Sequence, residues 1–222
     1  MGYRTARAAW KALICALALA AAAPAEAEGE PAGRFDYYVL ALSWSPTWCA
    51  LTGDMRGTPE PQCAAGAGRD FVVHGLWPQA ERGWPSFCRT VQRDPTRAET
   101  AAAADLFGGA GQAFYQWKKH GRCSGLAPAD YFALARRARA SVQTPPVLRE
   151  VKRRLAVPAE VIERAFLERN PVLTGDMVRV TCRAGLIEEI RVCLTKDLNP
   201  RTCSASVAPD CRLPDAGLLP PR

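Results

Sequence analysis

Histidine is scarce in this sequence, which has only His74 and His120 among its 222 residues. No second Cys/His pair at zinc-ligand spacing accompanies His120 and Cys123, and this argues against a zinc site. Beyond the N-terminal region, no apolar run approaches the about 20 residues that a membrane-spanning helix needs. Internal repeats are absent as well. These absences favour a single domain without a bound metal and without a membrane span.

The N-terminal segment has the composition of an export signal. Basic residues precede the short apolar run ALICALALAAAA, and Ala-x-Ala cleavage sites follow, the better one after Ala27 and a nearly equal one after Ala25. We therefore expect residues 1–27 to be removed and the protein to be periplasmic or secreted, with no membrane attachment afterwards. A retained anchor is the alternative, but the run is shorter than a span requires.

Export would place the cysteines in an oxidising compartment, where disulfides persist. Cys15 lies in the signal, and the remaining eight cysteines form an even set that predicts four disulfides. Their spacing does not select among the roughly 105 possible pairings. The formal charge of +7 is compatible with a polyanionic partner, but such a charge also serves solubility alone.

Apolar periodicity predicts strands near both ends of the domain and helices between them. Buried strands are expected at residues 34–44 and 71–77, and an antiparallel hairpin at residues 176–194. Helices are expected in five segments, namely residues 97–107, 111–121, 127–142, 144–156 and 157–171. This order is typical of an α+β fold, with a mostly antiparallel central sheet and several helices packed on it.

Two stretches lack such periodicity and are expected to be irregular. Residues 45–70 are rich in Gly, Pro and Thr and read as a loop that holds two of the cysteines. The Pro-rich C-terminal tail begins at about residue 207, and we expect it to be loosely held beyond Cys211. The mature chain, residues 28–222, is then one domain cross-linked by disulfides.

The second histidine lies near the C-terminal end of a predicted helix. Residues four apart share a helix face, so Gln116 lies under His120 and Tyr115 under Lys119. One patch therefore presents an imidazole, an ammonium group, an amide and a phenol, while Trp117 is expected to pack inward. The helix dipole favours the protonated form of His120, and the charge of Lys119 opposes it.

Two imidazoles and a fixed cation, without a metal, suit the cleavage of RNA by internal phosphoryl transfer. A base removes the 2′-hydroxyl proton, the oxygen attacks the adjacent phosphorus, and an acid protonates the departing 5′-oxygen. Histidine, with a reference pKa of about 6.5, can serve in either role, and each transfer contributes about 10²- to 10⁴-fold. A lysine ammonium group would stabilise the charge of the phosphorane. DNA lacks the 2′-hydroxyl, so we do not expect it to be cut.

The segments around both histidines, FVVHGLWPQ and QWKKHGRCSG, resemble the two active-site segments of the ribonuclease T2 family, the exported acid ribonucleases of fungi, plants and bacteria. That family carries H-G-L-W-P and H-E-W-x-K-H-G-T-C. The matching residues here are His74, Gly75, Leu76, Trp77, Pro78, Trp117, Lys119, His120, Gly121 and Cys123. The opening strand and the cysteine-rich end are similar too, so the resemblance covers most of the mature chain. It implies a ribonuclease T2-like fold and a monomer that cleaves single-stranded RNA without a cofactor.

The resemblance also implies a role for each matching residue. His120 is the general base and His74 the general acid of the first step, and their roles reverse when the 2′,3′-cyclic product is hydrolysed to a 3′-phosphate. Lys119 stabilises the phosphorane, and Trp77 stacks on a base. The implied disulfides are Cys49–Cys63, Cys88–Cys123, Cys182–Cys211 and Cys193–Cys203.

Three positions depart from the family pattern. Gln116 stands where the family has its glutamate, and Tyr115 stands where it has the preceding histidine. An amide can bond a phosphate but carries no charge, so reduced activity is one consequence. We keep Gln116 as a candidate catalytic residue and Tyr115 as a candidate substrate contact. Gln79 replaces an acidic base-reading residue of some relatives, so it is a third substrate contact with no transferable base preference.

These departures leave three hypotheses. The first is a metal-independent endoribonuclease, the second a catalytically impaired relative that binds RNA or a protein, and the third an interaction module with no nucleic-acid role. Other aromatic residues, Trp44, Trp48 and Trp84, are expected to pack in the core or in loops. The basic stretches ARRARA and EVKRR read as solvated helix faces.

Overall fold

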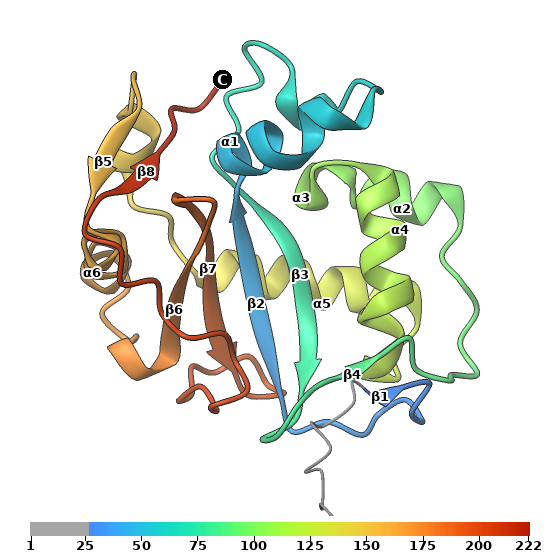
Figure 1. Cartoon of the computed structure of the whole chain (residues 1–222). Coiled ribbons are helices and arrows are strands. Elements are labelled where there is room, and N and C mark those ends of the chain that lie inside the picture. Colours follow the sequence, from blue (N-terminus) through green and yellow to red (C-terminus); the bar gives the residue numbers. More distant parts are fainter. Residues whose placement is uncertain (1–26) are drawn as a thin grey trace, which may run out of the picture.

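The computed structural model describes residues 27–222, so the predicted export signal lies, but for Ala27, outside the described residues. A six-stranded sheet forms the centre of the described part (Figure 1), with the order β3-β2-β7-β8-β5 and with β6 paired to β7. Its strands are β2 (Tyr37–Trp44), β3 (Phe71–Gln79), β5 (Leu155–Val157), β6 (Val178–Arg183), β7 (Leu186–Leu194) and β8 (Ala216–Leu218). All the pairings are antiparallel except that of β7 with β8. A separate short parallel pair joins β1 (Ala27–Glu28) to β4 (Pro85–Ser86).

The helices lie mainly between β3 and β6 in the sequence, so the α+β fold class is confirmed. They are α1 (Ser45–Trp48), α2 (Arg97–Ala102), α3 (Ala104–Phe107), α4 (Ala110–Lys119), α5 (Pro128–Ser141) and α6 (Ala159–Arg169). In Figure 1, α2, α3 and α4 lie beside β3, and α5 passes behind the sheet. No helix of the described part has the length and apolarity needed to cross a membrane.

The core fills the space between the sheet and these helices. Trp44, Trp117 and Tyr131 are fully buried there, and the hydroxyl of Tyr131 donates a hydrogen bond to the carbonyl of Leu76 at 3.0 Å. Because Leu76 belongs to β3 and Tyr131 to α5, this bond fixes the strand that carries the first histidine. The inward position of Trp117, predicted from the helix face, is confirmed.

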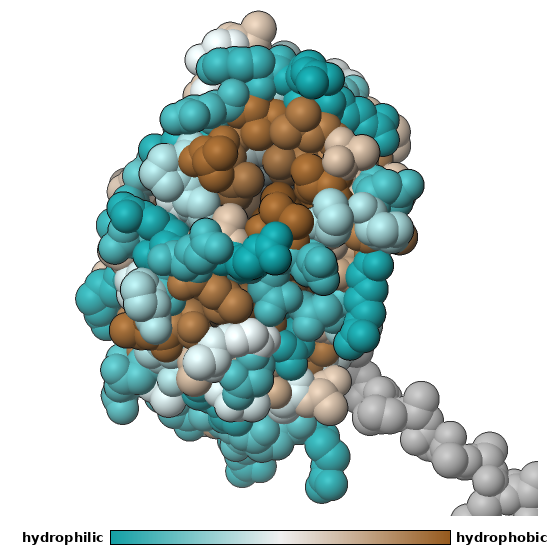
Figure 2. All heavy atoms as spheres, turned by 90° about the vertical axis from the view of Figure 1, so that its left-hand side faces the viewer, coloured by the Kyte–Doolittle hydropathy of each residue, from teal (hydrophilic) through white to brown (hydrophobic). Residues whose placement is uncertain are grey.

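The end of the sheet away from α4 consists of β5, β6 and β8, and α6 packs beside β6. Figure 2 looks onto this side and shows apolar side chains in patches between hydrophilic ones. The half-buried Leu155 and Val157 belong to the edge strand β5 there. In Figure 1, α4 lies at the other end of the sheet from this edge.

Two segments differ from the sequence prediction in their helical structure. Residues 45–63, expected to be a loop, form α1 and the short helical segments η1 (Cys49–Gly53), η2 (Asp54–Arg56) and η3 (Pro61–Cys63). Residues 144–156, expected to be a helix, form only the 3₁₀ turn η5 (Pro146–Glu150) and then enter β5. Successive prolines before the turn restrict the backbone, and pairing of β5 with β8 outweighs the helix propensity of the basic residues.

The C-terminal tail is held against the sheet, which corrects the expectation of a loose end. Ala216 and Leu218 of β8 are buried, and the indole nitrogen of Trp44 donates to the carbonyl of Leu219 at 2.9 Å. Arg222 forms a paired hydrogen bond with the carboxylate of Asp54. The high proline content predicts a loose tail, but burial of its apolar residues holds the tail in place.

Residues 27–222 contain four disulfides, and their pairing is the one that the family resemblance implies: Cys49–Cys63, Cys88–Cys123, Cys182–Cys211 and Cys193–Cys203. Cys123 lies in the 3₁₀ turn η4 (Gly121–Ser124) directly after His120. The Cys88–Cys123 bridge therefore anchors the end of α4 to the segment after β4. A remaining 3₁₀ turn, η6 (Gly175–Met177), precedes β6.

Candidate active site

Strand β3 and helix α4 bring the two histidines to one place. His74 lies within β3, and His120 follows the last residue of α4. The indole of Trp77 contacts both, with ring centroids 5.1 Å from His74 and 5.2 Å from His120. The two sequence segments that contain the histidines therefore lie together in the fold.

A β-bulge directs the first histidine. Gly75 pairs with Ala41 of β2 and Val73 pairs with Leu42, so His74 is left between two registers as the extra residue. Bulges re-aim side chains and are common beside active sites. The side chain of His74 is 40% exposed, whereas the flanking Val73 and Gly75 are buried.

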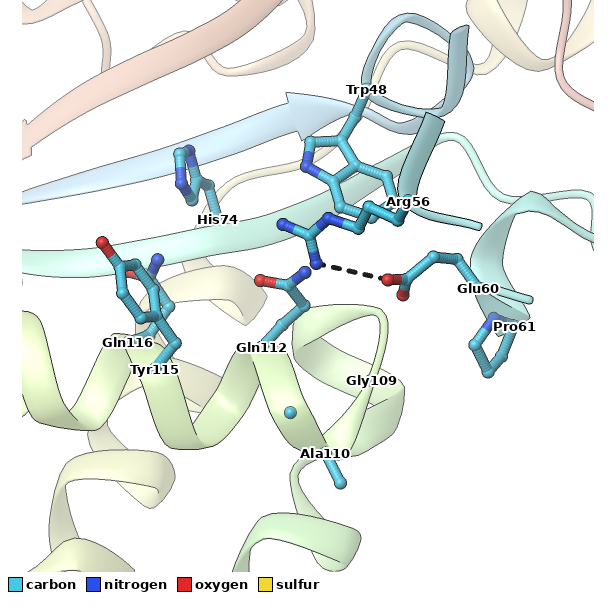
Figure 3. A pocket seen from close by; sticks show the side chains of 11 residues that line it. Trp48, Arg56, Glu60, Pro61, His74, Gly109, Ala110, Gln112, Tyr115 and Gln116 are labelled. Carbon is cyan, nitrogen blue, oxygen red and sulfur yellow. Dashed lines mark hydrogen bonds and ion pairs between the residues drawn. The ribbon is translucent and has the colours of Figure 1, made fainter. Parts of the chain in front are cut away.

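Two cavities meet at this point, and both are lined by His74, Tyr115 and Gln116. One cavity, of about 550 Å³, opens toward the disulfide-linked segment 45–63 and holds Trp48, Arg56, Glu60 and Gln112. Figure 3 shows it from nearby, with Trp48 and Arg56 above α4 and with Tyr115 and Gln116 on the helix. The other cavity, of about 350 Å³, holds Trp77, Trp84, Lys119, His120, Arg191 and Ser206.

His74 is held by a buried carboxylate. Its Nδ1 forms a hydrogen bond with Oε1 of Glu189, a residue of β7 that is 2% exposed. Ser43 Oγ donates to the same oxygen at 3.1 Å, and Arg191 donates to Oε2 from Nε at 2.9 Å. Burial alone would raise the pKa of the Glu189 carboxyl, but the hydrogen bond and charge of His74, together with Arg191, lower that pKa to about 2. Glu189 is therefore ionised at neutral pH.

His120 has the opposite environment. It is only 7% exposed, and its Nδ1 has no hydrogen-bond partner among the described residues. Burial, and then the charges of Lys119 and His74, lower the pKa of the His120 imidazole well below its usual value of 6.5. The helix dipole was expected to favour the protonated ring, but desolvation outweighs it because the ring is almost completely buried.

The amide of Gln116 ties the helix to the strand. Its side-chain oxygen accepts a hydrogen bond from the indole nitrogen of Trp77 at 3.0 Å, and the residue is 2% exposed. Gly75 lies against this contact: a Cβ there would come within 1.9 Å of Trp77 Nε1 and 2.4 Å of Gln116 Oε1. No larger residue fits at this position without moving both side chains.

The remaining predicted site residues fall into two groups. Lys119 and the half-exposed Tyr115 line the cavity beside His120, where they can reach a bound molecule. Gln79 does not line either cavity, because it is 5% exposed and its amide nitrogen donates to the carbonyl of Gly83 at 3.1 Å. Gln79 therefore holds a turn in this structure, and its expected contact with substrate stays a prediction.

Two tryptophans expected to serve as packing residues line the cavities instead. Trp84 lies in the smaller cavity and Trp48 in the larger one, where the guanidinium of Arg56 lies 5.2 Å from the Trp48 ring. Arg191 lies 5.1 Å from the ring of Trp77. Trp44, by contrast, is a core residue as expected.

Glu189 and Arg191 are the site residues that sequence reasoning missed. The signal for them is weak: two charged residues lie two positions apart in the strand LIEEIRVCL, so they share one face. Only the packing of β7 beside β2 shows that this face meets His74. Among residues 27–222, no group of three or more His, Cys, Asp or Glu side chains is arranged to hold a metal ion.

Comparison with known proteins points to one family of enzymes. The model described as Ribonuclease T2 family matches residues 35–203. A ribonuclease of Aeromonas hydrophila is 34% identical over 196 residues, which cover 85% of this chain and 86% of that protein. Ribonuclease I of Escherichia coli is 28% identical over 142 residues, or 47% of this chain and 53% of that protein.

Solved structures share the fold at low sequence identity. RNase NT in complex with 5′-AMP has a TM-score of 0.63 at 22% identity, covering 85% of this chain and 99% of that one. An RNase-related protein from Calystegia sepium has a TM-score of 0.64 at 22% identity, covering 83% and 97%. At this identity the likeness concerns the fold alone.

Proposed function

The chain belongs to the ribonuclease T2 family and is an RNA endonuclease of that type, and we propose that it cleaves single-stranded RNA without a metal ion. Cleavage would proceed by transphosphorylation to a 2′,3′-cyclic phosphate, followed by hydrolysis to a 3′-phosphate. The observation that carries the proposal is the opposite environment of the two histidines at one cavity: His120 is kept neutral by burial, and His74 bonds an ionised carboxylate. Pairs of titratable groups with opposed environments mark acid and base roles.

His120 is suited to act as the general base. A neutral imidazole has one nitrogen free to accept a proton, and Nδ1 of His120 is buried without a partner. Nε2 is therefore the nitrogen that receives the 2′-hydroxyl proton. The loss of this proton lets the 2′-oxygen attack the adjacent phosphorus.

His74 is suited to act as the general acid. Its Nδ1 bonds Glu189, so Nε2 is the nitrogen that donates a proton to the departing 5′-oxygen. The Glu189 carboxylate balances the charge of the imidazolium before the transfer. In the second step His74 takes a proton from water, and His120 returns its proton to the 2′-oxygen.

The other polar groups at the junction of the cavities bind the phosphate. The Lys119 ammonium group lies in the same cavity as His120 and stabilises the negative charge of the phosphorane. The Oε1 of Gln116 is occupied by Trp77, so the amide nitrogen is the atom left to donate to a phosphate oxygen. Trp77 and Tyr115 supply aromatic surface for a base, as in other readers of single strands.

Four disulfides fit an extracytoplasmic protein. We further propose that residues 1–27 direct export and are then removed. The mature domain, residues 28–222, would act as a monomer in the periplasm or outside the cell.

Incubation of the oxidised protein with single-stranded RNA in EDTA tests this function. We expect cleavage somewhere between pH 4 and 8, with 2′,3′-cyclic ends detected by mass spectrometry and a DNA strand of the same sequence left intact. An RNA with one 2′-O-methyl group serves as the matched control, because only that linkage should resist. Absence of cleavage across the whole pH range would contradict the proposal. It would favour the alternative of a catalytically impaired relative, which the amide at Gln116 suggests. Retention of RNA binding would then distinguish that relative from an interaction module.

A further inference from the structure

We propose that Glu189 is a positioning residue for His74, which it holds from the neighbouring part of the sheet through Nδ1. The inference rests on the proposed function and deepens it. No contact of Glu189 with RNA is required. Its action passes through the imidazole that it orients.

Small residues on the central strand allow this contact. Strand β2 lies between β3 and β7, and its Ala41 and Ser43 pair with Arg191 and Glu189 of β7. Adjacent strands are about 4.8 Å apart, so side chains of β3 and β7 can meet only above small residues of β2. Ser43 adds a hydrogen bond of 3.1 Å to Oε1 of Glu189.

The carboxylate is fixed before any substrate binds. Ser43 bonds Oε1, and the guanidinium of Arg191 bonds Oε2 at 2.9 Å and 2.8 Å. The remaining acceptor position of Oε1 is directed to Nδ1 of His74. A carboxylate held in this way selects the tautomer with the proton on Nδ1 and sets the orientation of the ring.

The proton balance of the first step follows from this arrangement. When Nε2 of His74 gives its proton to the 5′-oxygen, the ring becomes neutral and keeps the Nδ1 proton. Ser43 and the charged guanidinium of Arg191 still bond the Glu189 carboxylate after this transfer, so it stays ionised. The carboxylate therefore acts by orientation and charge balance and takes no proton itself.

Other charged or titratable groups also surround His74, and a test must separate Glu189 from them. They are Glu188 and Arg191 on β7, Tyr115, Lys119 and His120 on α4 or directly after it, and Arg56 and Glu60 in the segment 45–63. Glu188 provides the matched control. It neighbours Glu189 on the strand, but its carboxylate bonds Nε of Arg183 at 2.6 Å.

The test compares Glu189→Gln with Glu188→Gln on a dinucleoside monophosphate. For Glu189→Gln we expect kcat to fall on the order of 10²-fold while KM changes by less than about 2-fold, since orientation of the acid matters most in the transition state. The downfield proton resonance of His74 Nδ1–H should move upfield in that variant. Glu188→Gln should leave both readouts unchanged.

Wild-type kcat together with an unmoved His74 proton in Glu189→Gln would overturn the inference. If that variant does not fold, Ser43→Ala removes one hydrogen bond from the carboxylate and should lower kcat several-fold with the same upfield direction of the resonance. The resonance needs no catalysis, so it tests the Glu189–His74 coupling even if the wild type cuts no RNA. In that case the proposed function fails separately.

Discussion

The indole nitrogen of Trp77 donates a hydrogen bond to the side-chain oxygen of Gln116 at 3.0 Å, and this bond joins the strand that carries His74 to the helix that precedes His120. The contact is possible because residue 75 has no side chain. A glutamate at position 116 could accept the same bond, so the amide keeps the geometry but not the charge. Substitutions at Gly75 and at Gln116 should therefore alter catalysis.

Substitution of Gly75 by alanine is expected to disable the site without unfolding the protein. The new Cβ would lie 1.9 Å from Trp77 Nε1 and 2.4 Å from Gln116 Oε1, so the two side chains must separate. A displacement of about 1 Å at a reacting group can cost about 10²-fold in rate, and we expect a fall in kcat of that order. Steady-state kinetics and circular dichroism would measure the two effects.

Gly111→Ala is the control for this variant. Nothing lies within 4 Å of a Cβ at Gly111, which belongs to α4. Alanine there should change the free energy of unfolding by less than about 1 kcal/mol and leave kcat unchanged. If Gly75→Ala retained wild-type kcat, the contact between Trp77 and Gln116 would not be important for catalysis.

Restoring a carboxylate at position 116 is expected to shift the pH dependence of cleavage. Gln116 is buried near His74 and His120, so the charge of Gln116→Glu would favour their protonated forms. We expect the acidic limb of the kcat/KM profile to move to higher pH. Gln112→Glu places the same charge one turn earlier on α4 and should move the limb less. Equal shifts in the two variants would indicate a general charge effect.

The low pKa of His120 predicts activity in acid. Burial, Lys119 and His74 lower that pKa well below 6.5, so the base form persists below pH 6.5 and the acidic limb of kcat/KM should lie there. The same shift lowers stability in acid, because below pH 6.5 the unfolded chain takes up a proton at His120 that the folded chain does not. Activity and urea unfolding from pH 3 to 8 would measure both effects.

Lys119 contributes to the low pKa of His120, and its neighbour Lys118 provides the control. Lys119→Gln should move the acidic limb toward higher pH, in addition to lowering the rate. Lys118→Gln removes a charge that pairs with Asp94 at 3.3 Å and should leave the limb in place. An acidic limb at or above pH 6.5 in the wild type would mean that the burial of His120 does not control its protonation.

The Cys88–Cys123 disulfide is expected to contribute more stability than Cys193–Cys203. It closes a segment of 35 residues, compared with 10 for the other bridge. Loop entropy gives about 4 kcal/mol for the longer closure and about 3 kcal/mol for the shorter one. Urea unfolding of the two Ser/Ser double variants would measure this. Only the variant at 88 and 123 should also lose activity, because Cys123 follows His120 in the chain.

The sequence predicts those site residues that lie within one short segment of the chain. His74, His120, Lys119 and Gln116 could be placed because each belongs to a short motif or to one helix face. Glu189 could not, because its contact with His74 depends on the register of three strands and on Ser43 between them. Such a contact has no signature in the chain near either residue.

The strands that the sequence does not predict also depend on contacts between distant segments. Residues 155–157 and 216–218 are short and form strands only by pairing with each other, so neither segment has a strand pattern of its own. For Trp48 and Trp84 the sequence predicts packing in the core or in loops, because large aromatic side chains are usually buried. Their place in the cavities depends on how segment 45–63 and the turn after β3 approach α4. The position of Gln79 directly after a motif predicts a substrate contact, but the sequence alone does not show that its amide nitrogen donates to Gly83 in the following turn.

The assignment of His74 as acid and His120 as base is tested most directly with two substrates that differ only in the leaving group. A dinucleoside monophosphate needs a general acid to expel its 5′-oxygen, whereas a nucleoside 3′-(p-nitrophenyl phosphate) has a leaving group that departs without one. His74→Ala should lose at least about 10²-fold in kcat/KM on the dinucleoside and little on the aryl ester, while His120→Ala should lose activity on both. The reverse pattern, or equal losses of the two variants on both substrates, would contradict the account.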